Sequence, residues 1–313
     1  MSEKLLLLGN YGSPYSRKMI SLLRYRRIPY ELLWGDAANP PLHLGKQLPK
    51  AKPALLPTVY IPDDDGKLQA LTDSTPLIRR FEQDYSGRSV IPDSPALMFL
   101  NSLLEDFADE WGTKYMFHYR WSREADIEWA GTIIPLWISS VMPSTVHQKI
   151  KTMFAERQVS RLHYVGSNPQ TQPIIEASYK RLLVALNVHF EQHQFLFGDR
   201  PSSADFAFFG QLSQLVAVDP TPMQIAREIA PRVVAWTNIC DDLSGLAVEE
   251  SDWLDIQSIP SSLIDVFKEV ASGYVPAMLE NADAVQSGKA EWHTPIDGAI
   301  WKQKTFPYQA KCL

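Results

Sequence analysis

Apolar and polar positions in the first 90 residues alternate between short apolar runs and helical spacing. Four leucines at residues 5–8 form one such run, which is typical of a strand buried on both faces. Apolar residues then recur at roughly helical spacing over 14–27, which predicts an amphipathic helix. Later runs predict strands at 29–34, 57–61 and 67–71, and a helix from about 73 to 85. This order, a βαβ unit followed by a ββα unit, predicts a small α/β domain over residues 1–86.

The spacing of apolar residues changes after a linker rich in serine, glycine and proline at 86–95. Strand signals largely vanish, and helical spacing predicts helices at 96–110, 127–141, 145–163, 172–193, 202–216, 223–240 and 261–287, the last interrupted between Gly273 and Pro276. We expect residues 95–313 to form an all-helical domain. From about residue 246 this domain continues as an extension, in which 246–260 and 292–313 show no regular pattern. Residues 35–54 predict a proline-rich loop with one helical turn around 43–48.

Composition fits an ordinary globular protein of two domains. The 313 residues are 45% hydrophobic and 21% charged, with a formal net charge of −6, so no strongly basic surface is implied and nucleic acid is not an expected partner. The apolar-rich stretch at 132–142 is too short to span a bilayer, and the N-terminal apolar run is too short for a signal peptide. We therefore expect a soluble, cytoplasmic protein with no membrane partner.

The spacing of cysteine and histidine argues against metal and disulfide chemistry. The chain has two cysteines, Cys240 and Cys312, and neither lies in a C-x-x-C or zinc-like spacing. The seven histidines show no H-x-x-x-H or H-E-x-x-H pattern. We therefore expect no metal site and no disulfide framework.

The most informative motif is Ser13-Pro14, which follows the first predicted strand and opens the first predicted helix. Serine is a favoured N-cap, and proline suits the first turn because the N–H that it lacks would have no partner there. Ser13 would then lie at the positive end of a helix, where a thiolate is favoured and a hydroxyl can donate a hydrogen bond to the sulfur. The alternative is a helix cap with no chemistry.

Three motifs in this order resemble the cytosolic glutathione transferase family. The first, Ser13-Pro14-Tyr15-Ser16-Arg17, is similar to the serine-type active-site segment. The second, Leu55-Leu56-Pro57-Thr58-Val59, is similar to the segment in which a cis-proline opens the third strand. The third, Thr72-Asp73-Ser74, is similar to the acidic residue and serine that open the next helix. A fourth, structural match is the capping box that Ser202 and Asp205 predict. The resemblance implies a thioredoxin-like N-terminal domain joined to an all-helical C-terminal domain.

The resemblance also implies a site for glutathione as co-substrate. Ser13 would supply the catalytic hydroxyl that stabilises the thiolate. A cis Leu56–Pro57 bond would turn the Leu56 backbone out of the strand ladder to pair with the cysteinyl unit, and Asp73 and Ser74 would hold the γ-glutamyl group. The alternatives are a trans bond before Pro57 and an Asp73 that only favours the helix dipole.

Two further parts of the glutathione site are less well matched. Lys46, Lys50 and Lys52 are candidates for the glycyl carboxylate on charge alone, and we select Lys52. Tyr11 and Tyr15 each offer a hydroxyl near the sulfur, and we select Tyr15 as a binding residue. The alternative for each tyrosine is a packed ring with its hydroxyl in water.

An aromatic and basic cluster from Trp111 to Trp121 has two interpretations. It could line the electrophile pocket, where His118 or Arg120 would polarise a substrate. Ordinary packing between helices is the more common situation for such residues.

These motifs together predict a glutathione-dependent transferase that conjugates the glutathione thiolate to a small apolar electrophile, as in detoxification. Two alternatives stay open: a non-catalytic binding or interaction protein of the same fold, and a glutathione-dependent peroxidase or reductase. The absence of cysteine at positions 13 and 16 argues against disulfide reduction, because a mixed disulfide would need a thiol there. The resemblance further implies a homodimer, to which Arg79, Arg80 and Phe81 could contribute.

Overall fold

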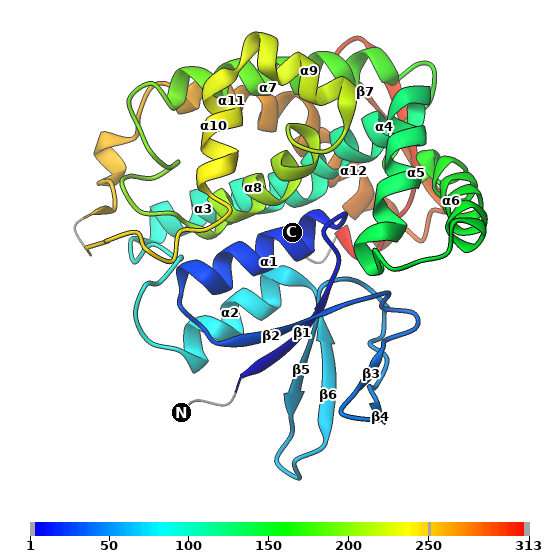
Figure 1. Cartoon of the computed structure of the whole chain (residues 1–313). Coiled ribbons are helices and arrows are strands. Elements are labelled where there is room, and N and C mark those ends of the chain that lie inside the picture. The colour runs from blue at the N-terminus through cyan, green and yellow to red at the C-terminus, as the bar shows by residue number, and fades with distance from the viewer. Residues whose placement is uncertain (1–3, 250–251, 310–313) are drawn as a thin grey trace.

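The N-terminal part of the computed structural model is a four-stranded mixed sheet with two helices on one face (Figure 1). The structure describes residues 4–249 and 252–309. The sheet has the order β2–β1–β5–β6, with β1 at Leu5–Gly9, β2 at Tyr30–Trp34, β5 at Thr58–Pro62 and β6 at Leu68–Thr72. β1 pairs parallel with β2 and antiparallel with β5, and β5 pairs antiparallel with β6. Helices α1 (Pro14–Tyr25) and α2 (Ser74–Asp84) lie between the sheet and the rest of the chain.

The four leucines of β1 are buried because both faces of the sheet are covered. Leu5 and Leu7 belong to the large core that the sheet shares with the helices. Leu6 and Leu8 pack on the other face in a smaller cluster with Leu48. The apolar run at the start of the sequence therefore reflects a strand with two apolar faces, as predicted.

The segment that supplies Leu48 differs from its prediction. In place of a helical turn at 43–48, two short strands pair there, β3 (Leu42–His43) and β4 (Lys46–Gln47). Leu44 and Gly45 join them with φ of 49° and 75°. A two-residue reversal of this kind needs left-handed backbone, which glycine adopts at little cost.

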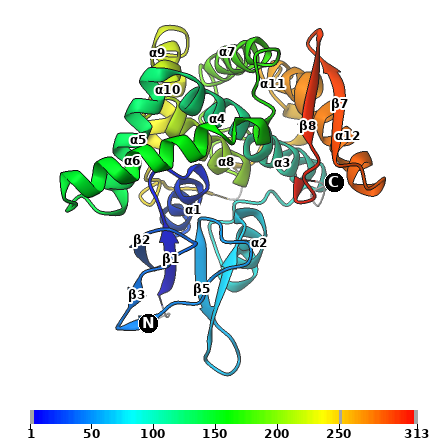
Figure 2. The same cartoon turned by 90° about the vertical axis from the view of Figure 1, so that its right-hand side faces the viewer.

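The remaining chain forms a mostly helical part that lies against α1 and α2 (Figures 1 and 2). Its helices are α3 (Pro95–Phe107), α4 (Thr113–Ser122), α5 (Glu124–Ile138), α6 (Ser144–Val159), α7 (Gln172–His189), α8 (Ser203–Leu215), α9 (Pro220–Ile229), α10 (Pro231–Ile239), α11 (Leu263–Glu269) and α12 (Val275–Gln286). In the described ranges, the structure contains no helix with the length and apolar character needed to cross a membrane.

Several helix boundaries differ from the predictions, and α4 was not predicted. π-helical turns join α3 to α4 at Ala108–Gly112 and α11 to α12 at Val270–Tyr274, so the interruption expected near Gly273 is a wider helical turn instead. The single helix expected at 223–240 divides into α9 and α10 at Pro231, which has no N–H with which to continue α9.

Helix α8 is the element of the helical part that meets α1 most closely. It begins with the predicted capping box, in which the Ser202 N–H donates to Asp205 Oδ2 at 2.8 Å. A Cβ atom at Gly210 would lie 2.6 Å from the carbonyl oxygen of Pro14, so only glycine allows this approach. Helix α8 therefore packs directly on the first turn of α1.

The C-terminal extension contains a β-hairpin where no regular element was predicted. Strands β7 (Glu291–Ile296) and β8 (Ala299–Lys304) pair antiparallel beside α12 (Figure 2). Asp297 and Gly298 connect them with φ of 45° and 83°, the two positive values that a type I′ turn requires. The predicted fold class is confirmed, with the correction that the described residues after 95 are mostly helical and include the β7–β8 hairpin.

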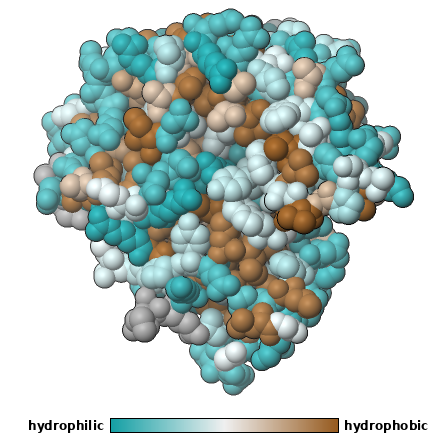
Figure 3. Space-filling model, in the orientation of Figure 1, coloured by the Kyte–Doolittle hydropathy of each residue, from teal (hydrophilic) through white to brown (hydrophobic). Residues whose placement is uncertain are grey.

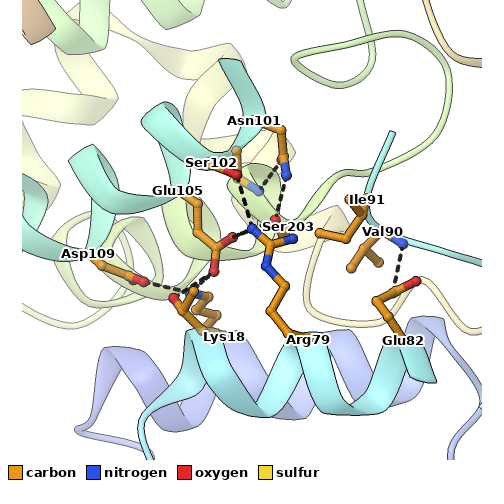
Figure 4. Close-up of polar contacts among 12 residues, drawn as sticks. Lys18, Arg79, Glu82, Val90, Ile91, Asn101, Ser102, Glu105, Asp109 and Ser203 are labelled. Carbon is orange, nitrogen blue, oxygen red and sulfur yellow. Dashed lines mark hydrogen bonds and ion pairs between the residues drawn. The ribbon is translucent and has the colours of Figure 1, made fainter. Parts of the chain in front are cut away.

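A buried ammonium group ties α1 to the helical part (Figure 4). Lys18 Nζ donates to Glu105 Oε1 at 2.9 Å and to Asp109 Oδ2 at 2.5 Å, and the side chains of Lys18 and Glu105 are each 1% exposed. Glu105 also accepts from Thr75 Oγ1 of α2 at 2.8 Å and from Ser203 Oγ of α8 at 2.6 Å. One carboxylate therefore links α1, α2 and α8 to α3.

Glu105 and Asp109 differ in how readily each stays ionised beside Lys18. Burial opposes the charge of Lys18, yet the charges of Asp109 and Glu105 raise its pKa. Burial also disfavours ionised Glu105, but Lys18 and the Ser203 hydroxyl lower the pKa of Glu105 overall. Burial raises the pKa of Asp109 to about 7 in spite of Lys18. Lys18 and Glu105 therefore form the ionised pair, and Asp109 is the carboxyl that takes up a proton first.

Replacing Lys18 by methionine is expected to lower the free energy of unfolding by about 3–5 kcal/mol, because the variant leaves a buried carboxylate without its cation. Chemical denaturation followed by circular dichroism would measure the change. Lys149→Met, at an exposed lysine of α6, is the matched control and should change the stability by less than about 0.5 kcal/mol. A loss below about 1 kcal/mol for Lys18→Met would contradict this account of the pair.

Candidate functional site

Three segments of the chain meet at one end of the sheet. The strand register aligns Leu8, Thr58 and Thr72 across β1, β5 and β6. β1 and β6 end there and β5 begins there, so the loop before α1, the residues before β5 and the start of α2 are neighbours. These segments contain Ser13, Leu56, Pro57, Asp73 and Ser74 of the predicted site.

The loop between β1 and α1 is built around Asn10 and Ser13. Asn10 Oδ1 accepts from the Gly12 N–H at 2.8 Å, and the Asn10 carbonyl accepts from the Ser13 N–H at 3.0 Å. Ser13 is the N-cap of α1, and its Oγ accepts from the Ser16 N–H at 3.2 Å. Because the cap uses this oxygen as an acceptor, the Ser13 hydroxyl can still donate its own proton. A helix cap and a hydroxyl that contacts a ligand are therefore compatible roles.

The helical part holds this loop through Arg120. Its Nη1 donates to the Gly12 carbonyl at 2.8 Å, while Nε donates to both carboxylate oxygens of Asp219 at 2.8 and 3.0 Å. Arg120 Nη2 donates to Gln214 Oε1 at 2.8 Å, and Gln214 Nε2 donates to the Tyr11 carbonyl at 3.0 Å. The guanidinium therefore positions the backbone that leads to Ser13.

His118, from the same aromatic and basic cluster, is also buried. Its Nδ1 lies 2.8 Å from Ser167 Oγ and its Nε2 lies 3.2 Å from Glu176 Oε1. Burial lowers the pKa of His118, although Glu176 partly opposes this effect. The contacts of His118 and Arg120 agree with the packing interpretation of the cluster.

Two cis peptide bonds, before Pro53 and before Pro57, lie in the segment that leads to β5. The second confirms the predicted cis-proline. Thr58 Oγ1 donates to the Leu55 carbonyl at 2.7 Å, and Thr72 Oγ1 donates to the Pro57 carbonyl at 3.1 Å. These bonds hold the segment against the end of β6.

Asp73 caps α2 in an unusual backbone conformation. Its φ is 81°, within the region that favours glycine, and its Oδ1 accepts from the Thr75 N–H at 3.4 Å. A residue held in such a region costs of order 1–3 kcal/mol, and such residues cluster at ligand sites. Asp73 is exposed, whereas the next residue, Ser74, is 4% exposed.

A cavity of about 710 Å³ lies between this end of the sheet and the helical part. Lys52 and Asp73, two residues of the predicted site, line it. Helix α3 contributes Glu105 and Asp106, and the C-terminal segment contributes Tyr308. The walls therefore carry both signs of charge, as a zwitterionic ligand requires.

Tyr15 is directed into the helical part. Its hydroxyl donates to the Asp109 carbonyl at 2.8 Å. Burial, together with the charges of Glu110 and Asp109, raises the pKa of Tyr15, so the hydroxyl stays protonated. Tyr15 thus makes a contact between the two parts of the chain, and its role in glutathione binding stays a prediction.

Several residues that line the cavity or support its walls were not among those expected. Glu105 and Asp109 are four residues apart, a spacing that places both on one helical face, and this pattern was an available signal. Tyr308 lies in a stretch without regular apolar spacing, so nothing local indicated its position. Its location depends on contacts made by the whole extension.

The raised pKa of Asp109 predicts a pH-dependent stability. The pKa rises from an ordinary value of 3.8 to about 7, so the folded state binds this proton more tightly than the unfolded state does. The contribution of the Asp109 carboxyl to the free energy of unfolding is complete below about pH 4, and it is lost as the pH rises through 7.

Asp109→Asn cannot ionise and should remove about 2–4 kcal/mol of the decline in unfolding free energy between pH 4 and 8. Denaturant unfolding at a series of pH values would test this. Asp265→Asn, at an exposed carboxylate paired with Lys268, is the control and should retain the wild-type profile. If the unfolding free energy of Asp109→Asn declined with pH as much as that of the wild type, the Asp109 carboxyl would not be the cause of the decline.

Two family models match the sequence. Residues 7–89 match the one described as "Glutathione S-transferase, N-terminal domain", and residues 158–238 match "Glutathione S-transferase, C-terminal domain". The matched residues together make up just over half of the chain. A comparison with curated proteins finds no match.

Solved structures with a similar arrangement include three glutathione transferases. One from Rhodospirillum rubrum F11 is 15% identical, with 82% of this chain and 95% of that chain covered and a TM-score of 0.45. One from Methylobacterium radiotolerans JCM 2831, in complex with glutathione sulfonate, is 15% identical, with coverage of 83% and 99% and a TM-score of 0.45. One from Burkholderia graminis, with two glutathione molecules bound per subunit, is 18% identical, with coverage of 76% and 83% and a TM-score of 0.44. On the two family-model matches, the chain belongs to the glutathione transferase family, with a thioredoxin-like N-terminal domain and a mostly helical C-terminal part.

Proposed function

We propose that this protein binds glutathione and conjugates it, through its thiolate sulfur, to an apolar electrophile. The observation that carries the proposal is the meeting of two helix N-termini, those of α1 and α2, at one end of the sheet. A helix N-terminus favours an anion. The N-terminus of α1 would serve the sulfur, and that of α2 would serve the γ-glutamyl carboxylate.

The tripeptide would lie across the three segments at this end of the sheet. Asp73, exposed on the cavity, would attract the γ-glutamyl ammonium, and the buried Ser74 would act through its backbone amide. Leu56, which precedes β5, would pair its backbone with the cysteinyl unit. Lys52, on the wall of the same cavity, would attract the glycyl carboxylate.

Ser13 would stabilise the sulfur anion. A free thiol has a pKa of about 8.5, so most of it is protonated at neutral pH. The Ser13 hydroxyl and the positive end of α1 would both favour the thiolate, and each unit by which they lower the thiol pKa corresponds to about 1.4 kcal/mol. Ser13 is not the nucleophile in this mechanism; the ligand's sulfur forms the new bond and expels the leaving group of the electrophile.

The electrophile would bind against aromatic side chains beside the same loop. Tyr11 stacks on Trp34 with ring centroids 4.5 Å apart, and the Trp137 ring of α5 lies 6.1 Å from Tyr11. Ile134 of α5 approaches Gly12 so closely that a Cβ there would lie 2.9 Å from its Cγ1. Apolar surface is exposed at the junction of the small domain and the helical part (Figure 3), which favours an apolar acceptor.

Thiol exchange by the protein is less well supported than conjugation. Cys240 is buried, and burial raises the pKa of its thiol, so it is a poor nucleophile. Cys312 lies outside the described residues. Peroxidase chemistry through the sulfur of glutathione and a non-catalytic binding role both stay compatible with the same site.

Calorimetric titration would test the site itself. Binding of both glutathione and S-methylglutathione would support it, because every proposed contact except that of Ser13 to the thiolate is to a group that the two peptides share. Binding without turnover of any electrophile would favour the non-catalytic alternative. Failure of both peptides to bind would exclude the glutathione site.

Ser13→Ala should reduce kcat/KM for glutathione and an activated aryl chloride by at least about tenfold, because it removes one hydrogen bond to the thiolate. The loss of the cap should cost about 1 kcal/mol of stability and leave the protein folded. Ser202→Ala, which removes the cap of α8, is the control and should retain the activity per folded molecule. An unchanged rate for Ser13→Ala would remove this hydroxyl from the mechanism.

We also propose a homodimer that pairs the faces formed by α2 and α3. A groove of about 750 Å³ there is lined by Arg79, Ile91, Met98 and Phe99, and Phe99 is 66% exposed. Phe81, expected from the sequence to contribute, is fully buried in the core and is not available to a partner.

Phe99→Asp should weaken the dimer by at least about tenfold, because it places a charge in an apolar contact. Sedimentation velocity over a range of concentrations would measure this. Leu279→Asp, at an exposed leucine of α12, is the control and should not change the oligomeric state. A monomeric wild type, or an unaltered dimer in Phe99→Asp, would refute this interface.

A further inference from the structure

The C-terminal segment Phe306–Gln309 returns from the hairpin to the helical part and is held there by a buried amide. Asn281 of α12 is fully buried, and its side chain bonds both backbone groups of Phe306: Nδ2 donates to the Phe306 carbonyl at 3.0 Å, and Oδ1 accepts from the Phe306 N–H at 2.8 Å. Oδ1 also accepts from Trp292 Nε1 of β7 at 3.1 Å. The start of the segment is therefore fixed.

The end of the segment is fixed from a different helix. Gln309 is buried, and its Nε2 donates to Glu110 Oε2 in the π-helical turn between α3 and α4. In the next turn, Lys114 Nζ donates to Gln303 Oε1 of β8 at 3.1 Å. The same π-helical turn provides the Asp109 carbonyl that accepts from Tyr15. The extension and the first helix of the small domain thus contact the same short stretch of chain.

Tyr308 lies between these two anchors and lines the cavity of the proposed glutathione site. It shares the wall with Lys52, Asp73 and Thr75 of the small domain. Tyr308 is 47% exposed. Figure 2 shows the end of the hairpin reaching down past α3 toward α2, in agreement with this contact.

We propose that Tyr308 is a binding residue for the γ-glutamyl end of glutathione, so that the C-terminal extension forms part of the ligand site. This inference rests on the proposed function. Asp73 and Thr75 belong to the first residues of α2, where the γ-glutamyl group would lie, and Tyr308 lines the same cavity from the helical side. A tyrosine offers a ring face for the ammonium and a hydroxyl for the carboxylate.

The test is calorimetric titration of the full chain with glutathione and with γ-glutamylcysteine, which lacks the glycyl unit. Tyr308→Ala should raise the Kd of both peptides by the same factor, about fivefold to tenfold, because the contact is to the group that they share. Tyr164→Ala, at a similarly exposed tyrosine that does not line this cavity, is the control and should leave both Kd values unchanged.

The outcomes separate the two proposals. A wild type that binds neither peptide would overturn the glutathione site and this inference with it. A wild type that binds both, with an unchanged Kd in Tyr308→Ala, would overturn only the role of Tyr308. Hydrogen exchange in the wild type gives a second test that needs no variant: glutathione should slow the exchange of amides in Phe306–Gln309, and an unaltered rate would contradict the contact.

Discussion

The arrangement of the site depends on a positive charge that has been removed from water. The Lys18 ammonium can be stable in the core only where carboxylates surround it, so α1 must lie where Glu105 and Asp109 of α3 and its π-helical turn can reach it. Ser13 begins the same helix five residues earlier, and Glu105 also bonds Thr75 in the first turn of α2. The two helix N-termini of the site are therefore positioned by one buried ionic cluster.

Much of the small domain was predictable because its signals are local. The leucines at 5–8 and the Ser13-Pro14 cap each act within a few residues, and the strand and helix that they predict lie where the pattern placed them. The cis bond before Pro57 followed from the resemblance to a family. The need for glycine at 210 could not be predicted from neighbouring residues, because it comes from the close approach of the Pro14 carbonyl on another helix.

The extension was harder to predict because its order comes from distant contacts. Trp292, Thr294 and Ile296 alternate with exposed residues before Asp297-Gly298, which is a hairpin pattern, but that pattern lay in a region expected to be helical or irregular. The position of Tyr308 requires Asn281 and Glu110, respectively 27 and 198 residues earlier in the chain. No spacing rule in the sequence connects such residues.

The two ends of the described chain stand at very different distances from the cavity. β1 begins at Leu5 and runs toward the end of the sheet that carries Ser13, so its first residue lies at the opposite end. Gln309 is adjacent to Tyr308 on the cavity wall. A fluorophore or affinity handle attached at the exposed Lys4, just ahead of β1, would therefore lie away from the cavity, whereas one attached at Tyr308 would lie on its wall.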